Sequence, residues 1–284
     1  MTTTLAFVHG AFLTSLSWEN FVPYFETRGY EVIAPEWPRR SKDPEEDREH
    51  PEGIAGLGVA EIVDHYDAIL RALPEPPVLV GHSFGGLFVE LLLDRGLGRA
   101  GVALDPAPPK GVLRLAVPEL RVASAALAHP SKRAGVVTLT PEQFNYGFTN
   151  TFPPEAARAA YERYAVPETG RIFYEGAFAT FELHSPLALD YGKPDRAPLL
   201  LTAASEDHTV PPQIVHSAFR KYERGPSRAD LIEFEGMPHL LMAGGPHWER
   251  VAGTVAEWLE RVLPAGSRPT PVATGFPSDT PGVD

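Results

Sequence analysis

The sequence predicts an α/β protein, in which a mostly parallel central sheet carries helices on both faces and a helical cap is inserted between two strands. Short apolar runs alternate with stretches of helical spacing along most of the chain, which is typical of a parallel sheet. From about residue 107 to residue 196 this alternation stops, and short helix-like pieces rich in alanine, proline and aromatic residues take its place. At residues 77–94 a strand, a tight turn and a helix follow one another directly.

The strands are predicted from apolar runs that are too short for helices and that end at glycine, proline or polar residues. We expect them at residues 4–8, 31–35, 78–80, 101–104, 198–203 and 230–234. Apolar residues at helical spacing predict helices over residues 18–28, 54–73, 87–94, 211–222 and 247–263. Between them, the charged and proline-bearing segment 39–53 predicts a solvated loop.

Three parts follow from this pattern. An α/β core comprises residues 1–106 and 197–264, and a helical cap without clear strands comprises residues 107–196. The tail, residues 265–284, is rich in proline, glycine, serine and threonine, so we expect it to be disordered.

Composition narrows the classes of partner. A net charge of -12 disfavours nucleic acid and anionic membrane surfaces, which leaves a small molecule as the expected partner. The chain has no cysteine, which excludes disulfides and thiolate metal sites. Without a cationic leader or a long apolar run, a cytoplasmic location is expected, and a homodimer stays open.

The turn at residues 81–85 carries the nucleophile-elbow pattern Gly81-x-Ser83-x-Gly85. A serine in a strained turn needs neighbours without Cβ atoms, because the following helix must pass close to the strand. The same pattern also occurs in plain turns, but the flanking strand and helix favour Ser83 as a catalytic nucleophile.

A serine nucleophile needs a base, and the base needs an acid that orients it. In parallel sheets these groups follow the carboxyl ends of strands. His239 comes after the last predicted strand and is the candidate base, and Asp207 comes after the preceding one and is the candidate acid. Glu206 and Asp105 remain rival acids, and Asp207 has a structural alternative as a residue at a helix N-terminus.

Two further histidines near strand ends, His208 and His247, are expected to be supporting or surface residues, and His82 is expected to shape the elbow.

Acyl transfer also needs donors for the developing oxyanion. The backbone N–H of Phe84, directly after the nucleophile, is one candidate. The second donor is expected from the loop that begins His9-Gly10, with Ala11 as first choice and Phe12 as rival; a plain turn is the structural alternative.

Together, Gly81-His-Ser-Phe-Gly-Gly86, His9-Gly10, Asp207-x-x-Val-Pro211 and Gly236-x-x-His239 resemble the α/β-hydrolase family over most of residues 4 to 263. The stretch from His9 to Trp18 and the run His239-x-x-Met242 look similar to the branch of methylesterases and hydroxynitrile lyases. Hydroxynitrile lyases of that branch carry threonine where this chain has Gly10 and lysine where it has Leu240, which favours ester hydrolysis.

The function that this resemblance and the residues imply is a cofactor-free serine hydrolase acting on a carboxylic ester. The predicted cap is dense in aromatic residues and poor in clustered lysine or arginine, which predicts a small, mostly apolar substrate. A lactonase, a carbon-carbon bond hydrolase, a lyase and a haloperoxidase-like enzyme with the same triad stay open. So does a ligand-binding protein on the hydrolase scaffold with a vestigial triad. No metal is expected.

Overall fold

The structure, a computed structural model, describes residues 2–112, 127, 130–245 and 247–264, and contains a central sheet of six parallel strands. The spatial order of the strands is β2-β1-β3-β4-β7-β8. Their bounds are β1 Thr4–Val8, β2 Glu31–Ile33, β3 Val78–His82, β4 Ala100–Leu104, β7 Leu199–Ala204 and β8 Ala229–Phe234. All six lie within one or two residues of the predicted runs, so the predicted α/β fold with a parallel sheet is confirmed.

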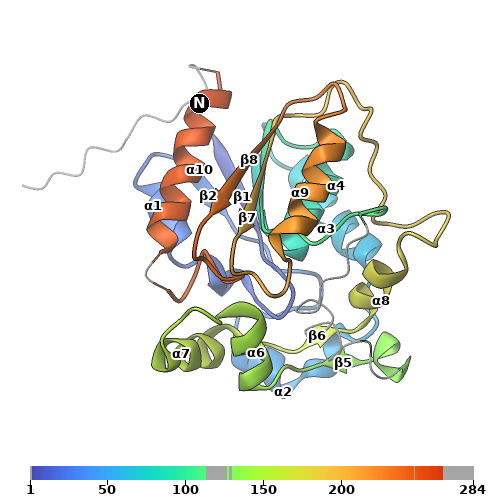
Figure 1. The fold of residues 1–284 in the computed structure, drawn as a ribbon, viewed down its shortest axis with the longest axis vertical. Coiled ribbons are helices and arrows are strands. Elements are labelled where there is room, and N and C mark those ends of the chain that lie inside the picture. The colour runs from blue at the N-terminus through green and yellow to red at the C-terminus, as the bar shows by residue number, and fades with distance from the viewer. Residues whose placement is uncertain (1, 113–126, 128–129, 246, 265–284) are drawn as a thin grey trace, which may run out of the picture.

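Helices cover both faces of the sheet, as Figure 1 shows. On one side lie α1 (Phe21–Glu26) and α10 (Trp248–Val262), which pack on each other. On the other side lie α3 (Val59–Arg71), α4 (Phe84–Asp94) and α9 (Pro212–Tyr222). The helix α4 is buried from Phe84 to Leu93, because it runs through the centre of the core against β3 and β4.

Two predicted helices are shorter in the structure. The predicted helix 18–28 divides into a 3-10 turn, η1 (Ser15–Trp18), and α1, and the predicted helix 54–73 begins only at Val59.

The segment 39–53, predicted as a solvated loop, is largely exposed as expected but is not a loop. The segment forms α2 (Pro44–Glu49) and the 3-10 turn η2 (Pro51–Ile54). Asp43 caps α2 by accepting from the N–H of Glu45. Within the segment, the Arg40 side chain is fully buried and pairs with Asp47 at 2.9 Å. These two charged side chains can be buried because each has a partner of opposite charge.

We call the segment between β4 and β7 the insertion, and its labelled helices and short strands lie beyond the carboxyl ends of the sheet strands (Figure 1). Its described elements are η3 (Pro130–Ala134), β5 (Val136–Val137), α6 (Pro141–Phe148), α7 (Pro154–Tyr164), β6 (Glu168–Thr169) and α8 (Arg171–Phe178). The expectation that it holds no strand is wrong, because β5 and β6 pair antiparallel. Each has two residues, too few for an alternating pattern in the sequence.

The insertion is bonded to the loops that follow the sheet strands. The N–H of Val166 donates to the carbonyl of Phe12, and the N–H of Leu240 donates to the carbonyl of Phe148. Residues 113–126 and 128–129 of the predicted cap and the predicted disordered tail, 265–284, lie outside the described residues. Among the described helices, none combines the length and apolar character needed to cross a bilayer.

Candidate functional site

Ser83 lies at the sharp turn between β3 and α4. Its backbone adopts φ 55° and ψ -121°, a conformation that non-glycine residues rarely hold. The turn is held from both sides, since the Ser83 N–H donates to the carbonyl of Leu104 and its carbonyl accepts from the N–H of Ala107. The strain is therefore supported by the neighbouring strand β4.

Two glycines make this turn sterically feasible. A Cβ atom on Gly81 would lie 2.1 Å from the carbonyl oxygen of Gly85, and one on Gly85 would lie 2.1 Å from the carbonyl oxygen of Val8. Both distances are far inside van der Waals contact, and the clashing atoms belong to the backbone. The pattern of glycines in the sequence thus reflects the close approach of α4 to the sheet.

The structure brings His239 and Asp207 together. The ring atom Nδ1 of His239 lies 2.6 Å from Oδ2 of Asp207, and both side chains are fully buried. The other carboxylate oxygen of Asp207 accepts from the backbone N–H groups of Thr209 and Val210, each at 2.7 Å. Asp207 therefore has a fixed orientation. It also lies in the turn before α9, so the alternative position at a helix N-terminus applies to it as well.

The remaining ring nitrogen of His239 is ready to act as a proton acceptor. With Nδ1–H donated to a carboxylate, Nε2 carries the lone pair. This atom is buried and makes no hydrogen bond with the residues that the structure describes. Bonds from catalytic bases are often completed only when substrate binds.

His82 links the elbow to the loop of His239. Its Nε2 lies 2.9 Å from the carbonyl oxygen of His239, and the two rings lie 4.6 Å apart. Burial, together with the nearby His239, holds the pKa of His82 well below its ordinary value, so the neutral ring donates to that carbonyl. His82, which was expected to shape the elbow, thus also contacts the loop that carries His239.

Asp105, the rival acid after β4, lies close to the pair without taking its place. One carboxyl oxygen accepts from the hydroxyl of Thr202 at 3.3 Å, and the other is buried without a partner among the described residues. Burial and the charge of Asp207 raise the pKa of Asp105 well above its ordinary value, which favours a neutral carboxyl group. Its backbone φ of 44° is a second strained conformation at this sheet edge.

The two carboxyl groups and the imidazole are also close enough to one another to be considered as metal ligands. One possible ligand atom each of Asp105, Asp207 and His239 lies within 4.8 Å of the others. However, Asp207 already uses both oxygens for hydrogen bonds to His239 and to backbone N–H groups. The arrangement fits proton transfer better than cation binding.

The candidate oxyanion donors lie in the loop after β1 and at the start of α4. Phe84 is the first residue of α4, where the N–H has no acceptor one turn earlier in the helix. A Cβ atom on Gly10 would lie 3.0 Å from the Cβ of Ser83, so the loop after β1 runs against the elbow.

Within that loop, the rival donor Phe12 is already engaged. Its N–H donates to Oε2 of Glu168 at 3.1 Å, which leaves Ala11 as the stronger candidate for the second donor. Sequence reasoning missed Glu168, because the residue stands in a two-residue strand without any motif around it.

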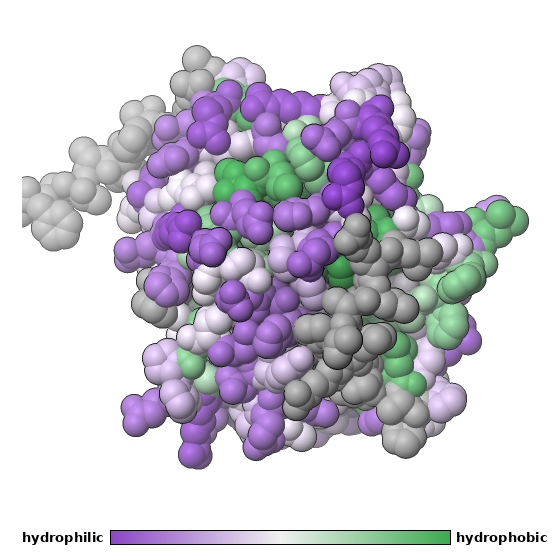
Figure 2. All heavy atoms as spheres, in the orientation of Figure 1, coloured by the Kyte–Doolittle hydropathy of each residue, from purple (hydrophilic) through white to green (hydrophobic). Residues whose placement is uncertain are grey.

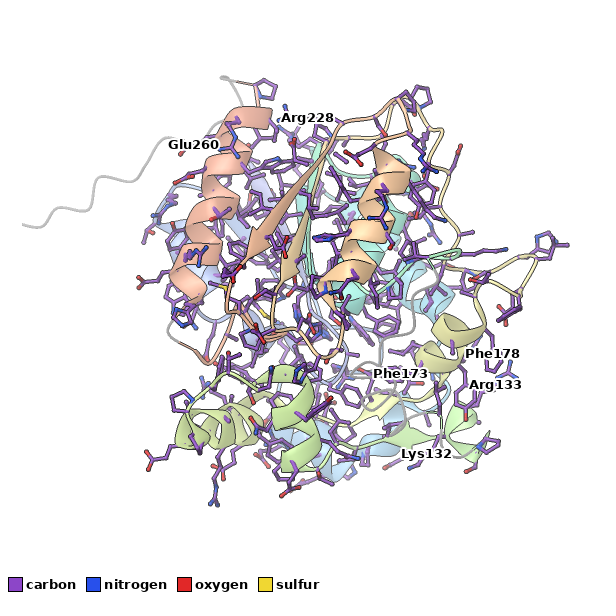
Figure 3. The ribbon with its side chains drawn as sticks, in the orientation of Figure 1. Lys132, Arg133, Phe173, Phe178, Arg228 and Glu260 are labelled. Atoms are coloured by element: carbon purple, nitrogen blue, oxygen red, sulfur yellow. The ribbon has the colours of Figure 1, made fainter. Side chains whose placement is uncertain are left out.

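Four phenylalanine rings surround the elbow and the base. Phe173 of α8 stacks on Phe12 at 5.3 Å and meets Phe84 edge-on at 5.5 Å. Phe148 of α6 contacts both Phe12 and the ring of His239, the latter at 5.0 Å. Figure 3 shows Phe173 on the inner side of α8, between the sheet and the rest of the insertion. The surroundings of the elbow are therefore strongly apolar.

The other candidates lie apart from this group. Glu206 is exposed, and Asp207 instead of Glu206 holds His239. His208 is half-buried with Nδ1 2.9 Å from the carbonyl oxygen of Tyr146, and His247 is exposed before α10. Both fit the supporting or surface places that the sequence indicated.

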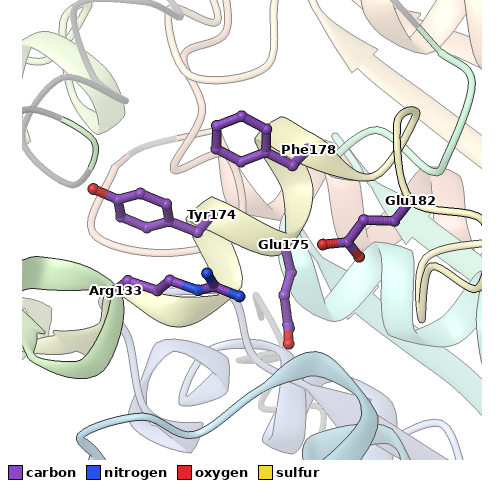
Figure 4. A pocket seen from close by; sticks show the side chains of 5 residues that line it. All are labelled: Arg133, Tyr174, Glu175, Phe178 and Glu182. Carbon is purple, nitrogen blue, oxygen red and sulfur yellow. The ribbon is translucent and has the colours of Figure 1, made fainter. Parts of the chain in front are cut away.

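A separate cavity of about 200 Å³ lies on the outer side of α8 (Figure 4). It is lined by Arg133, Tyr174, Glu175, Phe178 and Glu182. Glu175 is already bonded to Arg171 and to the N–H of Val59, so its charge serves the packing of α8.

Beside this cavity, hydrophobic side chains emerge at the loop after α8, seen as green spheres at the right edge of Figure 2. The exposed ones are Phe178, Phe181 and Leu183.

Comparisons with known proteins identify the family and the fold. A model described as the alpha/beta hydrolase family matches residues 5–254. The search of curated proteins found no match.

Several solved structures are similar to this chain. A monoacylglycerol lipase of Paleococcus ferrophilus has a TM-score of 0.66 and 21% identity, with 92% of this chain and 96% of that chain covered. Tomato Methylketone Synthase I, in complex with 2-tridecanone, has a TM-score of 0.67 and 16% identity, with 93% of this chain and 100% of that chain covered. A pyrethroid hydrolase from Sphingobium faniae has a TM-score of 0.63 and 18% identity, with 92% of this chain and 98% of that chain covered. At these identities the likeness shows the fold alone.

Proposed function

This chain belongs to the alpha/beta hydrolase family, and we propose that it is a serine hydrolase that cleaves a carboxylic ester of a small, mostly apolar substrate. The observation that carries the proposal is the buried pair of His239 and Asp207. The carbonyl of His239 is also bonded to the ring of His82, the residue directly before Ser83. Ester hydrolysis needs this combination of an activated hydroxyl, a base and an orienting acid.

In the proposed reaction, Ser83 Oγ attacks the ester carbonyl carbon while Nε2 of His239 takes the hydroxyl proton. The charge that forms on the carbonyl oxygen is held by the N–H groups of Phe84 and Ala11. The tetrahedral intermediate then expels the alcohol, which receives the proton from His239. A water molecule, deprotonated by His239, attacks the acyl-enzyme, and Ser83 leaves with the proton as the acid is released. Asp207 stabilises the imidazolium in both halves.

The substrate class is supported by the rings that surround the elbow. Phe12, Phe84, Phe148 and Phe173 offer apolar contacts to an acyl or alcohol group, and none of them compensates a buried charge. In this proposal residues 107–196 act as a cap that supplies two of these rings. A lipase and a pyrethroid hydrolase among the similar folds, as their names state, also fit an apolar substrate.

The proposal is tested with p-nitrophenyl acetate and butyrate and with a fluorophosphonate probe. Wild-type enzyme is expected to hydrolyse the esters and to carry the probe on Ser83, as mapped by mass spectrometry. Ser83→Ala is expected to lose about a thousandfold or more in kcat and all labelling. Ser217→Ala, a change on the exposed side of α9, is the matched control and keeps both.

Equal hydrolysis by wild type and Ser83→Ala would show that the assignment is wrong. Tight binding of a ligand without any labelling of Ser83 would instead favour a ligand-binding protein on this scaffold.

A second candidate is another reaction of the same triad, such as lactone hydrolysis, carbon-carbon bond hydrolysis or a lyase reaction. It is favoured by the likeness to Methylketone Synthase I, whose name describes a different chemistry on this fold. Product analysis with lactones, dienoates and cyanohydrins separates these reactions, because the elbow places no constraint on the leaving group.

A further inference from the structure

We propose that Glu168 of β6 is a positioning residue, which holds the loop after β1 in the shape that lets the Ala11 N–H act as an oxyanion donor. The inference rests on the proposed function and adds a residue of the insertion to it.

The backbone N–H and carbonyl of Phe12 are both hydrogen-bonded to the segment 166–168 of the insertion. Its N–H donates to Oε2 of Glu168 at 3.1 Å, and its carbonyl accepts from the N–H of Val166 at 3.0 Å. Both partners come from one short stretch that is more than 150 residues away in sequence. The insertion thus fixes the orientation of the peptide groups that flank Phe12.

These hydrogen bonds act on a strained backbone. Phe12 has φ 63°, in the left-handed region that a residue with a bulky side chain avoids. A hydrogen bond from a backbone N–H to a carboxylate is stronger than one between neutral groups, so it can offset this strain. If the carboxylate were removed, a return of the Phe12 backbone to negative φ would lower its conformational energy.

Glu168 is itself held rigidly. Its Oε2 also accepts from Nη2 of Arg40 at 2.8 Å, and its Oε1 accepts from the N–H of Thr169 at 2.8 Å. The side chains of Glu168 and Arg40 are both fully buried. Arg40 is fixed in turn by Asp47 and by the carbonyl of Pro167. A buried carboxylate with these partners has one orientation.

The other end of the loop is fixed by the elbow. Gly10 lies so close to His82 and Ser83 that a Cβ atom there would stand 2.9 Å from the His82 ring. Ala11 lies between this contact and the contact of Phe12 with Glu168. A shift at Phe12 therefore has to be taken up at Ala11, whose N–H the proposed mechanism uses.

The test compares Glu168→Ala and Glu168→Gln with the control Asp47→Asn. The control removes a charge partner of the same Arg40 but leaves the contact with Phe12 in place. Glu168→Ala is expected to lower kcat for p-nitrophenyl butyrate roughly ten- to hundredfold, with KM changed by less than about threefold. Inhibition by an aliphatic trifluoromethyl ketone, which forms an oxyanion adduct with the serine, should weaken in parallel. Glu168→Gln is expected to recover part of the activity, because its amide oxygen can accept from Phe12 and Arg40 while its NH2 group faces the N–H of Thr169.

The inference is overturned if Asp47→Asn loses as much kcat as Glu168→Ala, or if Glu168→Ala changes KM alone. If Glu168→Ala does not fold, hydrogen exchange of the Phe12 amide in wild type and in Glu168→Gln decides. Slow exchange in both is expected, and exchange at the rate of an open loop contradicts the proposal. Wild-type enzyme without any esterase activity would refute the proposed function, whereas an active wild type matched by Glu168→Ala would refute only the role of Glu168.

Discussion

Nδ1 of His239 and Oδ2 of Asp207 lie 2.6 Å apart in a fully buried contact, between residues that follow β8 and β7. Neighbouring parallel strands place the two loops at the same edge of the sheet, so the contact needs no long side chain. A carboxylate at Nδ1 fixes which tautomer the imidazole adopts. The first prediction follows from this tautomer.

Asp207→Asn is expected to lower kcat about a thousandfold or more while leaving the fold intact. The amide can present its NH2 group to Nδ1, which favours the tautomer with the hydrogen on Nε2, and this tautomer cannot accept the serine proton. Steady-state kinetics with p-nitrophenyl butyrate and circular dichroism measure the two effects. The exposed neighbour supplies the control, since Glu206→Gln should change kcat by less than about twofold. Equal losses in both variants would contradict the assignment.

Asp105→Asn is expected to keep kcat at pH 7 within about threefold of wild type. Burial and the charge of Asp207 raise the pKa of Asp105 well above its ordinary value, which favours the neutral acid, and a neutral amide has nearly the same shape. The same kinetic assay, run from pH 6 to pH 9, checks this. A hundredfold loss at pH 7 would mean that Asp105 acts as a charged acid beside His239.

Glu90→Gln is expected to make the protein more stable at alkaline pH. Burial raises the pKa of Glu90 in α4 to about 8 in the folded state, although the hydroxyl of Tyr222 donates to it at 2.6 Å. Between the unfolded value near 4.5 and about 8, the folded state keeps a proton that the unfolded state has lost. The free energy of unfolding therefore falls as pH rises through this window, by up to about 1.4 kcal/mol per pH unit.

Urea denaturation at pH 5 and pH 8 measures this difference. Wild type should lose several kcal/mol between the two values. Glu90→Gln should lose less than wild type by the share of Glu90, because its amide does not titrate, whereas Asp105 still does. The control Glu257→Gln, at an exposed position on α10, should behave as wild type does. A parallel decline in Glu90→Gln and wild type would refute the role of Glu90.

Gly85→Ala is expected to destabilise the protein by at least about 3 kcal/mol or to prevent folding, because the new methyl group would stand 2.1 Å from the carbonyl oxygen of Val8. Neither backbone can move without displacing β1 or α4. Gly53→Ala is the control, since its Cβ has no atom nearer than 3.7 Å and the position is exposed. Thermal unfolding should separate the two variants clearly, and similar melting temperatures would contradict the close packing of α4 on the sheet.

The central sheet could be predicted because each strand is a short apolar run that ends in a recognisable turn, as at Val8 and at Phe234. The contact between Asp207 and His239 followed from the same rule, since polar residues after parallel strands converge at one edge. These predictions depend on local patterns that a sequence carries in full.

Arg40 and Glu168 could not be predicted in this way. They pair with each other across more than a hundred positions of sequence. The charge around Arg40 suggested a solvated loop, and no motif marks Glu168. The strands β5 and β6 were not predicted for a related reason, because two residues are too few to show an alternating hydrophobic pattern. The features that could not be predicted are contacts between distant segments, neither of which contains a motif.

The direct pairing of β4 with β7 has a consequence for how the molecule is made. The ribosome must synthesise the whole stretch between Leu104 and Leu199 before the open edge of β4 can be covered, which takes on the order of ten seconds. During this interval the nascent chain already contains Ser83 but neither Asp207 nor His239, and it presents an unpaired parallel edge. Nascent-chain aggregation and chaperone demand should therefore be greatest when synthesis has reached the insertion, well before the final helix emerges.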